Sequence, residues 1–170
     1  MHALRDITHG SQITVSYLAD VGTDTQGRRR QLQADFGFRC ACTTCGLSGI
    51  DLALSDQRRS RIGQLSALIQ VAVNGEMRLG MPQNHTRKPT DAVHLVEERL
   101  QLMDDEGVGG TAWDTLYAGC AYSRSIGDKF AATRYASRAA ESARLALGRD
   151  SAEFQKYASF IGSRAKPGAK

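Results

Sequence analysis

Apolar residues recur at helical spacing from about residue 52 to residue 161, and short polar breaks divide them into separate runs. Runs of this kind, bounded by capping residues and glycines, are typical of amphipathic α-helices. We therefore predict five helices joined mostly by short turns. Their expected bounds are Ser55 to Asn74-Gly75, Thr90 to about Gly107, Thr111 to Gly127, Lys129 to Leu147, and Asp150 or Ser151 to about Ile161.

Residues 1 to about 48 show a different pattern, with short β-like runs and many turn residues. Between Ile13 and Tyr17 apolar and polar side chains alternate, which is typical of a half-buried strand. Residues 4–7 are the expected partner strand across a turn at residues 8–11, where Gly10 would supply a positive φ. A two-stranded hairpin is only marginally stable in water, so we expect it to pack against another part of the fold.

The change of pattern near residues 46–49 divides the chain into residues 1–48 and residues 49–170. We predict a mostly α protein, with a small β-hairpin and a cysteine loop first and an antiparallel helical region after them. Within that region, residues 116–139 resemble a tetratricopeptide helix hairpin.

The composition is that of an ordinary soluble globular protein, with 41% apolar and 24% charged residues among 170. No apolar run approaches the roughly 20 residues of a membrane-spanning helix, and no stretch of signal-peptide length opens the chain. The net charge of +4 permits a nucleic-acid or acidic partner but does not require one. The densest basic cluster, Arg28-Arg29-Arg30, is expected on a solvent-exposed loop beside a short helix near Arg29–Asp35.

Three of the four cysteines lie in one hexapeptide, Cys40-Ala-Cys42-Thr-Thr-Cys45. Three thiolates that a turn brings together can bind one tetrahedral Zn²⁺ ion. Without a secretory signal, a disulfide framework is not expected. Two alternatives remain open: structural cysteines without a metal, and redox chemistry of the pair Cys42 and Cys45, which would leave Cys40 without a role.

A structural zinc site needs four ligands, and the hexapeptide supplies three of them. The other candidates are the four histidines and the remaining cysteine, namely His2, His9, His85, His94 and Cys120. Isolated histidines are more often surface or capping residues. Cys120 lies in the middle of a predicted helix, so we expect a buried core thiol there. One ligand of the zinc site is therefore missing from the sequence pattern.

Three aromatic residues stand near these motifs. Tyr17 ends the predicted strand, and its spacing alone fits an ordinary core or edge aromatic. Phe36 and Phe38 directly precede the cysteines. Their rings either pack under the metal loop or form a stacking surface for a flat ligand ring.

The order of these motifs resembles a known family. Arg5-Asp-Ile-x-x-Gly-x-x-Ile-Thr-Val-Ser-Tyr17, then about twenty residues, then Phe36-Gly-Phe-x-Cys-x-Cys-x-x-Cys45, resembles the end of a SET domain with its post-SET cysteine loop. The spacing is similar to that of SET-and-MYND proteins and their fungal relatives, in which a tetratricopeptide-like helical region follows. The resemblance covers residues 1–48 well and the helical region loosely.

This resemblance implies a protein-lysine N-methyltransferase that uses S-adenosylmethionine and acts on protein or histone lysines in the nucleus or cytoplasm. The family's active-site tyrosine falls on Tyr17, whose hydroxyl would hold the lysine amine and the transferring methyl group in line. Phe36 and Phe38 would line the lysine channel and the adenine side of the cofactor. The zinc loop, with ligands Cys40, Cys42 and Cys45, would close one wall of both pockets.

Two upstream motifs of that family are not found in the sequence. They are a Gly-rich cofactor loop and an Asn-His motif that also supplies the fourth zinc cysteine; Asn84-His85 lacks that cysteine. We therefore expect a C-terminal fragment of such a methyltransferase that is inactive by itself. The alternative is a non-catalytic module in which a zinc loop staples a helical region with a peptide-binding groove. A small thiol-redox protein is a third hypothesis.

Overall fold

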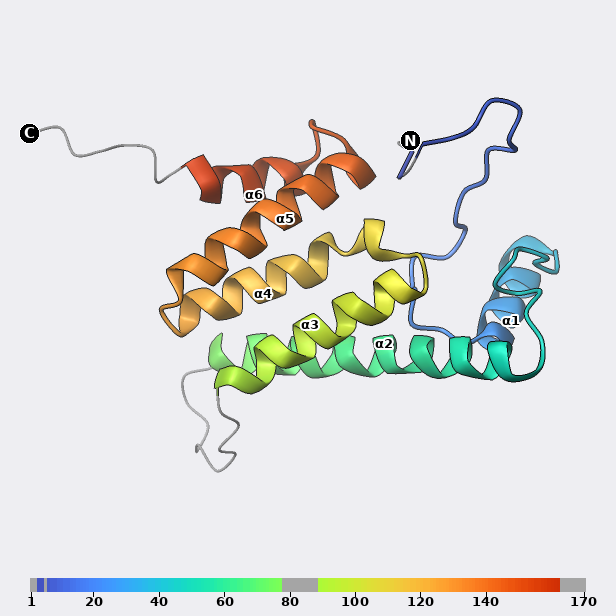
Figure 1. The fold of residues 1–170 in the computed structure, drawn as a ribbon, viewed down its shortest axis with the longest axis horizontal. Helices are drawn as coiled ribbons and strands as arrows, with labels where there is room; N and C mark the ends of the chain where they lie inside the picture. Colours follow the sequence, from blue (N-terminus) through green and yellow to red (C-terminus); the bar gives the residue numbers. More distant parts are fainter. Residues whose placement is uncertain (1–2, 5, 78–88, 163–170) are drawn as a thin grey trace, which may run out of the picture.

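The computed structural model describes residues 3–4, 6–77 and 89–162, and these fold almost entirely into α-helices (Figure 1). The predicted mostly α architecture is confirmed. None of the described helices is both long and apolar enough to cross a membrane. In chain order the elements are α1 (Thr25–Phe36), α2 (Gly49–Met77), α3 (Pro89–Asp105), the 3₁₀ turn η1 (Gly109–Thr111), α4 (Trp113–Ser125), α5 (Lys129–Leu147) and α6 (Ala152–Gly162).

Helices α2 to α6 pack against their neighbours in chain order, and α1 lies at one end beside the start of α2 (Figure 1). The core lies among α2, α3, α4, α5 and α6. On α5, small side chains at helical spacing make one buried face, which allows close approach to α4 and α6. This face consists of Ala132, Ala136, Ala139, Ala140 and Ala143, together with the ring of Tyr135.

Helix bounds agree with the prediction where a capping residue sets them. Helix α5 runs from Lys129 to Leu147 as predicted, and the Asp128 side chain caps it by accepting a hydrogen bond from the backbone N–H of Ala131. At the start of α6, the Ser151 hydroxyl accepts a hydrogen bond from the N–H of Phe154.

The predicted bounds of the helix that starts at Ser55 were wrong at both ends. Helix α2 begins six residues earlier, at Gly49, and continues past Asn74-Gly75 to Met77. Ser55 therefore lies inside the helix, where its hydroxyl donates to the Glu106 carboxylate at 2.8 Å instead of capping a terminus. The loop predicted after residue 75 falls mostly outside the described residues.

The predicted β-hairpin was also wrong, because no strand forms in the described part of residues 3–18. The turn itself is present: the N–H of Ser11 donates to the carbonyl of Thr8 at 3.0 Å, and Gly10 has a φ of +81°. The two arms do not pair, and Ile13 is 72% exposed. A lone two-stranded ribbon buries too little apolar surface to be stable without a further layer.

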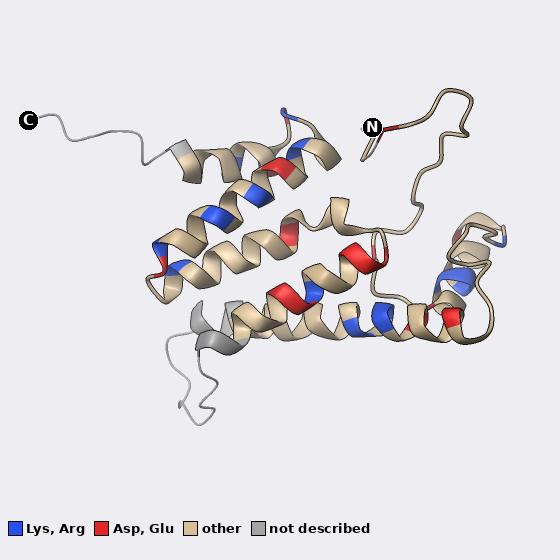
Figure 2. Cartoon of the chain, in the orientation of Figure 1, with Lys and Arg blue, Asp and Glu red and all other residues tan. Residues whose placement is uncertain are grey.

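Basic and acidic side chains are interleaved along the helices (Figure 2). Several form ion pairs between helices, such as Arg61 on α2 with Glu98 on α3 at 2.7 Å. The Arg134 side chain on α5 reaches Glu97 on α3. The surplus of +4 is therefore distributed over the elements, with many charges already paired.

Candidate metal and cofactor site

The three clustered cysteines converge in the loop between α1 and α2. Their Sγ atoms all lie within 4.8 Å of one another. In a tetrahedral site, Zn–S bonds of about 2.3 Å place the sulfur atoms slightly less than 4 Å apart. Small side-chain adjustments are therefore enough for the three thiols to share one ion, and the group could bind a metal such as zinc.

One tight turn produces this convergence. The N–H of Gly46 donates to the carbonyls of Cys42 at 2.8 Å and Thr43 at 3.2 Å. Cys42 and Cys45 therefore lie one turn apart, and Cys40 reaches them from the preceding stretch of chain. The Cys45 thiol is buried, whereas Cys42 is exposed. The loop thus folds over Cys45 and leaves one side of the group open.

Arg28 brings a buried positive charge to this loop, so the prediction of a solvent-exposed arginine cluster was wrong for this residue. Helix α1 begins at Thr25, with Asp24 as its N-cap, and Arg28 lies inside it with 7% exposure. Its Nη2 lies 3.8 Å from Cys45 Sγ and donates to Thr25 Oγ1. Its Nη1 donates to the Thr23 carbonyl at 2.7 Å.

The charge of Arg28 suits a metal–thiolate group. Three thiolates and one Zn²⁺ ion carry a net charge of −1, which a single guanidinium neutralises. Arg29 adds a second contact, because its Nη2 donates to the backbone carbonyl of Cys45 at 2.5 Å. Only Arg30 of the three is exposed as predicted.

The thiol pKa values differ within the group. Burial raises the pKa of Cys45 above its ordinary value, although the hydrogen bond from Arg28 acts in the opposite direction. Burial also acts to raise the pKa of Cys42, but hydrogen bonds from the backbone of Cys45 and from the two neighbouring thiols outweigh it and lower that pKa. Cys42 therefore supplies a thiolate to a metal more readily than Cys45 does.

Within the described residues, no histidine, cysteine, aspartate or glutamate supplies a fourth ligand to this group. His9 and His94 lie elsewhere, and His2 and His85 are outside the described residues. Cys120 is a core thiol with 2% exposure, as predicted, and burial raises its pKa. The described part of the chain thus offers three of the four ligands of a structural zinc site.

The three aromatic residues singled out in the sequence meet in one cluster. The Tyr17 ring lies 5.1 Å from the Phe36 ring and 5.2 Å from the Phe38 ring, centroid to centroid, in two edge-to-face contacts. The two Phe rings are 6.5 Å apart. Tyr17 and Phe36 are 56% and 50% exposed. The cluster therefore leaves aromatic surface exposed instead of forming a closed core under the loop.

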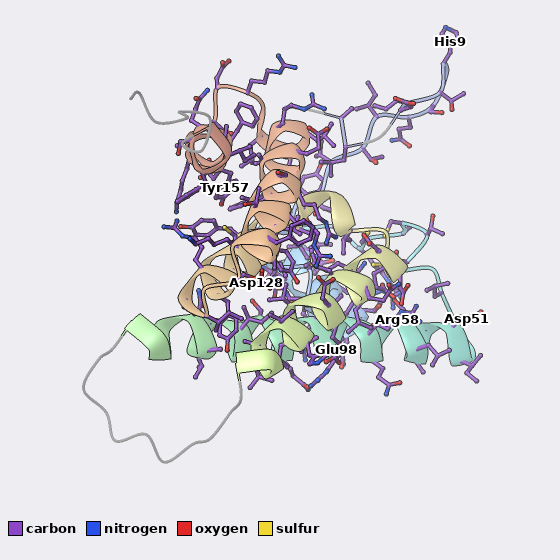
Figure 3. The ribbon with its side chains drawn as sticks, turned by 60° about the vertical axis from the view of Figure 1, so that its left-hand side comes forward. His9, Asp51, Arg58, Glu98, Asp128 and Tyr157 are labelled. Carbon is purple, nitrogen blue, oxygen red and sulfur yellow. The ribbon has the colours of Figure 1, made fainter. Side chains whose placement is uncertain are left out.

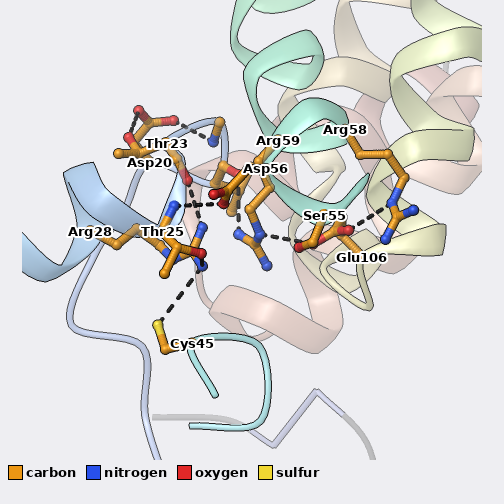
Figure 4. A network of polar contacts seen from close by, with 12 residues as sticks. Asp20, Thr23, Thr25, Arg28, Cys45, Ser55, Asp56, Arg58, Arg59 and Glu106 are labelled. Carbon is orange, nitrogen blue, oxygen red and sulfur yellow. Dashed lines mark hydrogen bonds and ion pairs between the residues drawn. The ribbon is translucent and has the colours of Figure 1, made fainter. Parts of the chain in front are cut away.

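Polar contacts connect the cysteine loop to the helical region through α1 (Figure 4). The Thr25 hydroxyl accepts a hydrogen bond from Arg28, and the Thr25 backbone N–H donates to Asp56 Oδ1 on α2 at 2.7 Å. A continuous path thus runs from Cys45 through Arg28 and Thr25 to Asp56.

A close backbone contact fixes the same joint. At Gly22, just before α1, an added Cβ would lie 2.6 Å from the Cα of Gly63 on α2. Only glycine fits there, because real Cβ atoms do not approach backbone atoms so closely. The Val21 carbonyl next to it accepts a hydrogen bond from Arg59 Nη1 at 3.2 Å.

Comparison with known proteins finds one distant similarity at the level of sequence. No family model matches the chain. It is 27% identical over 101 residues to a protein named histone-lysine N-methyltransferase set5, from Schizosaccharomyces pombe. The match covers 59% of this chain and 30% of the length of that relative. The chain thus spans only about a third of the relative.

Sequence reasoning found the three cysteines and the three rings but missed Arg28 and Thr25. A signal for them was present. If Asp24 is taken as an N-cap, the helix starts at Thr25, and Arg28 and Leu32 then lie one turn apart on the same face. Both are buried in the structure.

Proposed function

We propose that this chain contributes the zinc-loop wall of an S-adenosylmethionine-dependent protein-lysine N-methyltransferase of the SET class. The observation that carries the proposal is the convergence of Tyr17, Phe36 and Phe38 into one half-exposed aromatic cluster next to the three-cysteine loop. These are the residues to which the family resemblance assigns the active site and its metal. The distant similarity to a histone-lysine methyltransferase supports the same class.

In this proposal residues 1–48 belong to the catalytic part, and residues 49–170 form a tetratricopeptide-like helical part that carries it. S-adenosylmethionine, when bound, supplies an electrophilic methyl group. The Tyr17 hydroxyl would hold the lysine amine in line with it, and edge-to-face contacts from the two Phe rings fix the position of that phenol. A lysine must be neutral to react, and a channel that excludes water disfavours the ammonium form.

The metal would act as a structural staple. Cys40, Cys42 and Cys45 would hold it, and Arg28 would balance the charge of the thiolates. Because the same segment carries Phe38 two residues before Cys40, loss of the metal would also displace the ring cluster. Substrate lysines would be those of proteins such as histones, and the site of action the nucleus or cytoplasm.

The test is metal analysis followed by cofactor titration of the purified chain. We expect one zinc per chain, and loss of that zinc in Cys42→Ser. The aromatic NMR resonances of Phe36 and Phe38 should then shift when S-adenosylmethionine is added at millimolar concentration to the zinc-loaded chain. Phe130, which is 82% exposed on α5, supplies an internal control whose resonances should not move.

Two results would overturn the proposal. If the Phe36 and Phe38 resonances of the zinc-loaded chain do not shift when the cofactor is added, the result would favour the non-catalytic, zinc-stapled interaction module. A chain that binds no zinc and instead forms a Cys42–Cys45 disulfide would favour the thiol-redox hypothesis. If the cofactor binds, Tyr17→Phe should keep that binding and abolish methyl transfer to histones by the intact enzyme.

A further inference from the structure

A groove of about 470 Å³ lies in the helical region and shares no residue with the cysteine loop or with α1. Residues of α2, α3, α4 and α6 line it. Small side chains, Ala118 and Ala121 on α4, lie along it and leave room for a ligand. The groove also contains three aromatic residues, Trp113, Tyr117 and Tyr157.

The aromatic residues form one continuous wall. The ring of Tyr117 on α4 stacks on the ring of Tyr157 on α6, with centroids 4.9 Å apart and planes at 29° (Figure 3 labels Tyr157). Trp113 lies 6.5 Å from Tyr157. Tyr157 is 3% exposed, so the wall is fixed in place by the packing of α6.

The chain's own Lys156 already places a cation on this wall. Its Nζ lies 4.1 Å from the centroid of the Tyr117 ring and 6.0 Å from that of Tyr157. The described residues offer this ammonium no carboxylate within ion-pair distance. The π faces are thus its partner, which identifies this wall as a cation-binding surface. Lys156 is exposed, so another cation can compete with it for the ring face.

Two carboxylates add negative charge to the groove. Glu153 is half-buried and makes no hydrogen bond or ion pair with any described residue. Asp114 is 49% exposed and pairs with Arg99 at 3.5 Å. Arg99 is itself buried, and it also donates to the Thr115 hydroxyl. Its guanidinium therefore already has partners within the protein.

The two carboxylates also act on the pKa of Tyr157. Burial is the main cause that raises the pKa of Tyr157 to about 12, and the negative charges of Glu153 and Asp114 add to it. Burial disfavours a charge of either sign, so only the contributions of Glu153 and Asp114 show that the field at Tyr157 is negative.

We propose that this groove binds the cationic side chain, lysine or arginine, of a basic peptide segment, which displaces Lys156 from the face of Tyr117. Two partly exposed rings, Trp113 and Tyr117, backed by the buried ring of Tyr157 and with carboxylates at the rim, are the chemistry that recognises an ammonium or guanidinium group. The site is separate from the aromatic cluster of Tyr17. The proposal therefore stands whether or not the chain belongs to a methyltransferase.

The single tryptophan of the sequence, Trp113, lies in the groove and reports binding directly. The first probe is a short peptide whose only charged residue is a central lysine. The second and third are the same peptide with norleucine or aspartate in place of that lysine. We expect the lysine peptide to change Trp113 fluorescence in a saturable way that weakens with salt. The norleucine and aspartate peptides should not.

Variants separate the contributions. Lys156→Met removes the internal competitor and should tighten lysine-peptide binding by roughly twofold to fivefold. Glu153→Gln should weaken it by a similar factor, and Tyr117→Leu should abolish it. Lys129→Met and Glu141→Gln, both exposed on α5, are matched controls that should leave binding unchanged.

Three results would overturn the proposal. Equal binding of the norleucine peptide would make the groove a purely apolar site. Preferred binding of the aspartate peptide would make it an anion site that acts through Arg99. No response of Trp113 to the lysine peptide, in wild type and in a Lys156→Met variant with unchanged circular dichroism, would remove the site altogether.

Discussion

The Nη2 atom of Arg28 lies 3.8 Å from the Sγ atom of Cys45, and both residues are almost fully buried. A buried guanidinium is costly unless a negative group compensates it. Its other hydrogen bonds go to neutral oxygens, the Thr23 carbonyl and the Thr25 hydroxyl. A thiolate in the cysteine group would supply the compensating charge, so Arg28 is placed to support a metal at the candidate site without being a ligand.

Replacing Arg28 should weaken metal binding. Arg28→Met keeps much of the apolar stem and removes the charge, so the thiolates lose their counter-charge. By analogy with other groups that support metal ligands, we expect zinc affinity to fall about tenfold to a hundredfold. Competition with a chromophoric chelator measures it. Arg30→Met, at an exposed position of the same helix, is the control; equal affinities in the two variants would contradict the role of Arg28.

The close contact between Gly22 and Gly63 should make the chain sensitive to a larger residue at position 22. Gly22→Ala would place a Cβ 2.6 Å from backbone, so the segment before α1 must shift. We expect a loss of about 1–3 kcal/mol in the free energy of unfolding, as for other overpacked sites. Chemical denaturation measures this loss. Gly46→Ala, whose Cβ would meet its nearest atom at 3.4 Å, should be much milder; similar losses in both would argue against the close contact.

Glu106 should be far more important for stability than Glu98. Its carboxylate is 3% exposed and accepts hydrogen bonds from Ser55, Arg58 and Arg59. Glu106→Ala leaves buried Arg59 without its anion, and we expect a loss of about 3–5 kcal/mol. The Arg61–Glu98 pair has similar geometry but is exposed on both sides, so Glu98→Ala should be close to wild type in thermal denaturation. A mild Glu106→Ala variant would contradict the buried network.

The difference between what the sequence predicts and what it does not is illustrated by Asp128 and Ser55. Both are good N-cap residues. Asp128 does cap α5, because the cap needs only the backbone N–H of the residue three positions later in the chain. Ser55 instead donates to Glu106, which is 51 residues away. A local sequence pattern can therefore predict the cap by Asp128, but it cannot predict the long-range hydrogen bond of Ser55.

The same reasoning explains the candidate site. Cys40, Cys42 and Cys45 are close in sequence, so their convergence follows from one turn, and the prediction needed no distant partner. The alternation at residues 13–17 is typical of a strand, yet a strand also requires a paired neighbour, which the pattern cannot supply. Arg28 looked solvated because charge is usually exposed, and only the packing of α1 on the cysteine loop overrides that rule.

Alkaline pH should destabilise the helical region through Tyr135. Its side chain is fully buried, and its hydroxyl donates to Glu97. Burial, then the hydrogen bond to Glu97 and its charge, raise its pKa to about 12, whereas an unfolded tyrosine has a pKa of about 10. The folded state therefore holds this proton more tightly. Its contribution is complete below pH 10 and is lost as the pH rises towards 12.

The Tyr135→Phe variant isolates this effect. At pH 8 it should be less stable than wild type by about 1 kcal/mol, because the hydrogen bond to Glu97 is gone. Between pH 10 and 12 wild type should lose stability more steeply, because phenylalanine cannot ionise in the unfolded state. Urea unfolding at several pH values measures both slopes. Tyr157, whose pKa is also raised to about 12, is present in both proteins and cancels in the comparison. A difference between the two proteins that stays constant up to pH 12 would mean that Tyr135 keeps an ordinary pKa when folded.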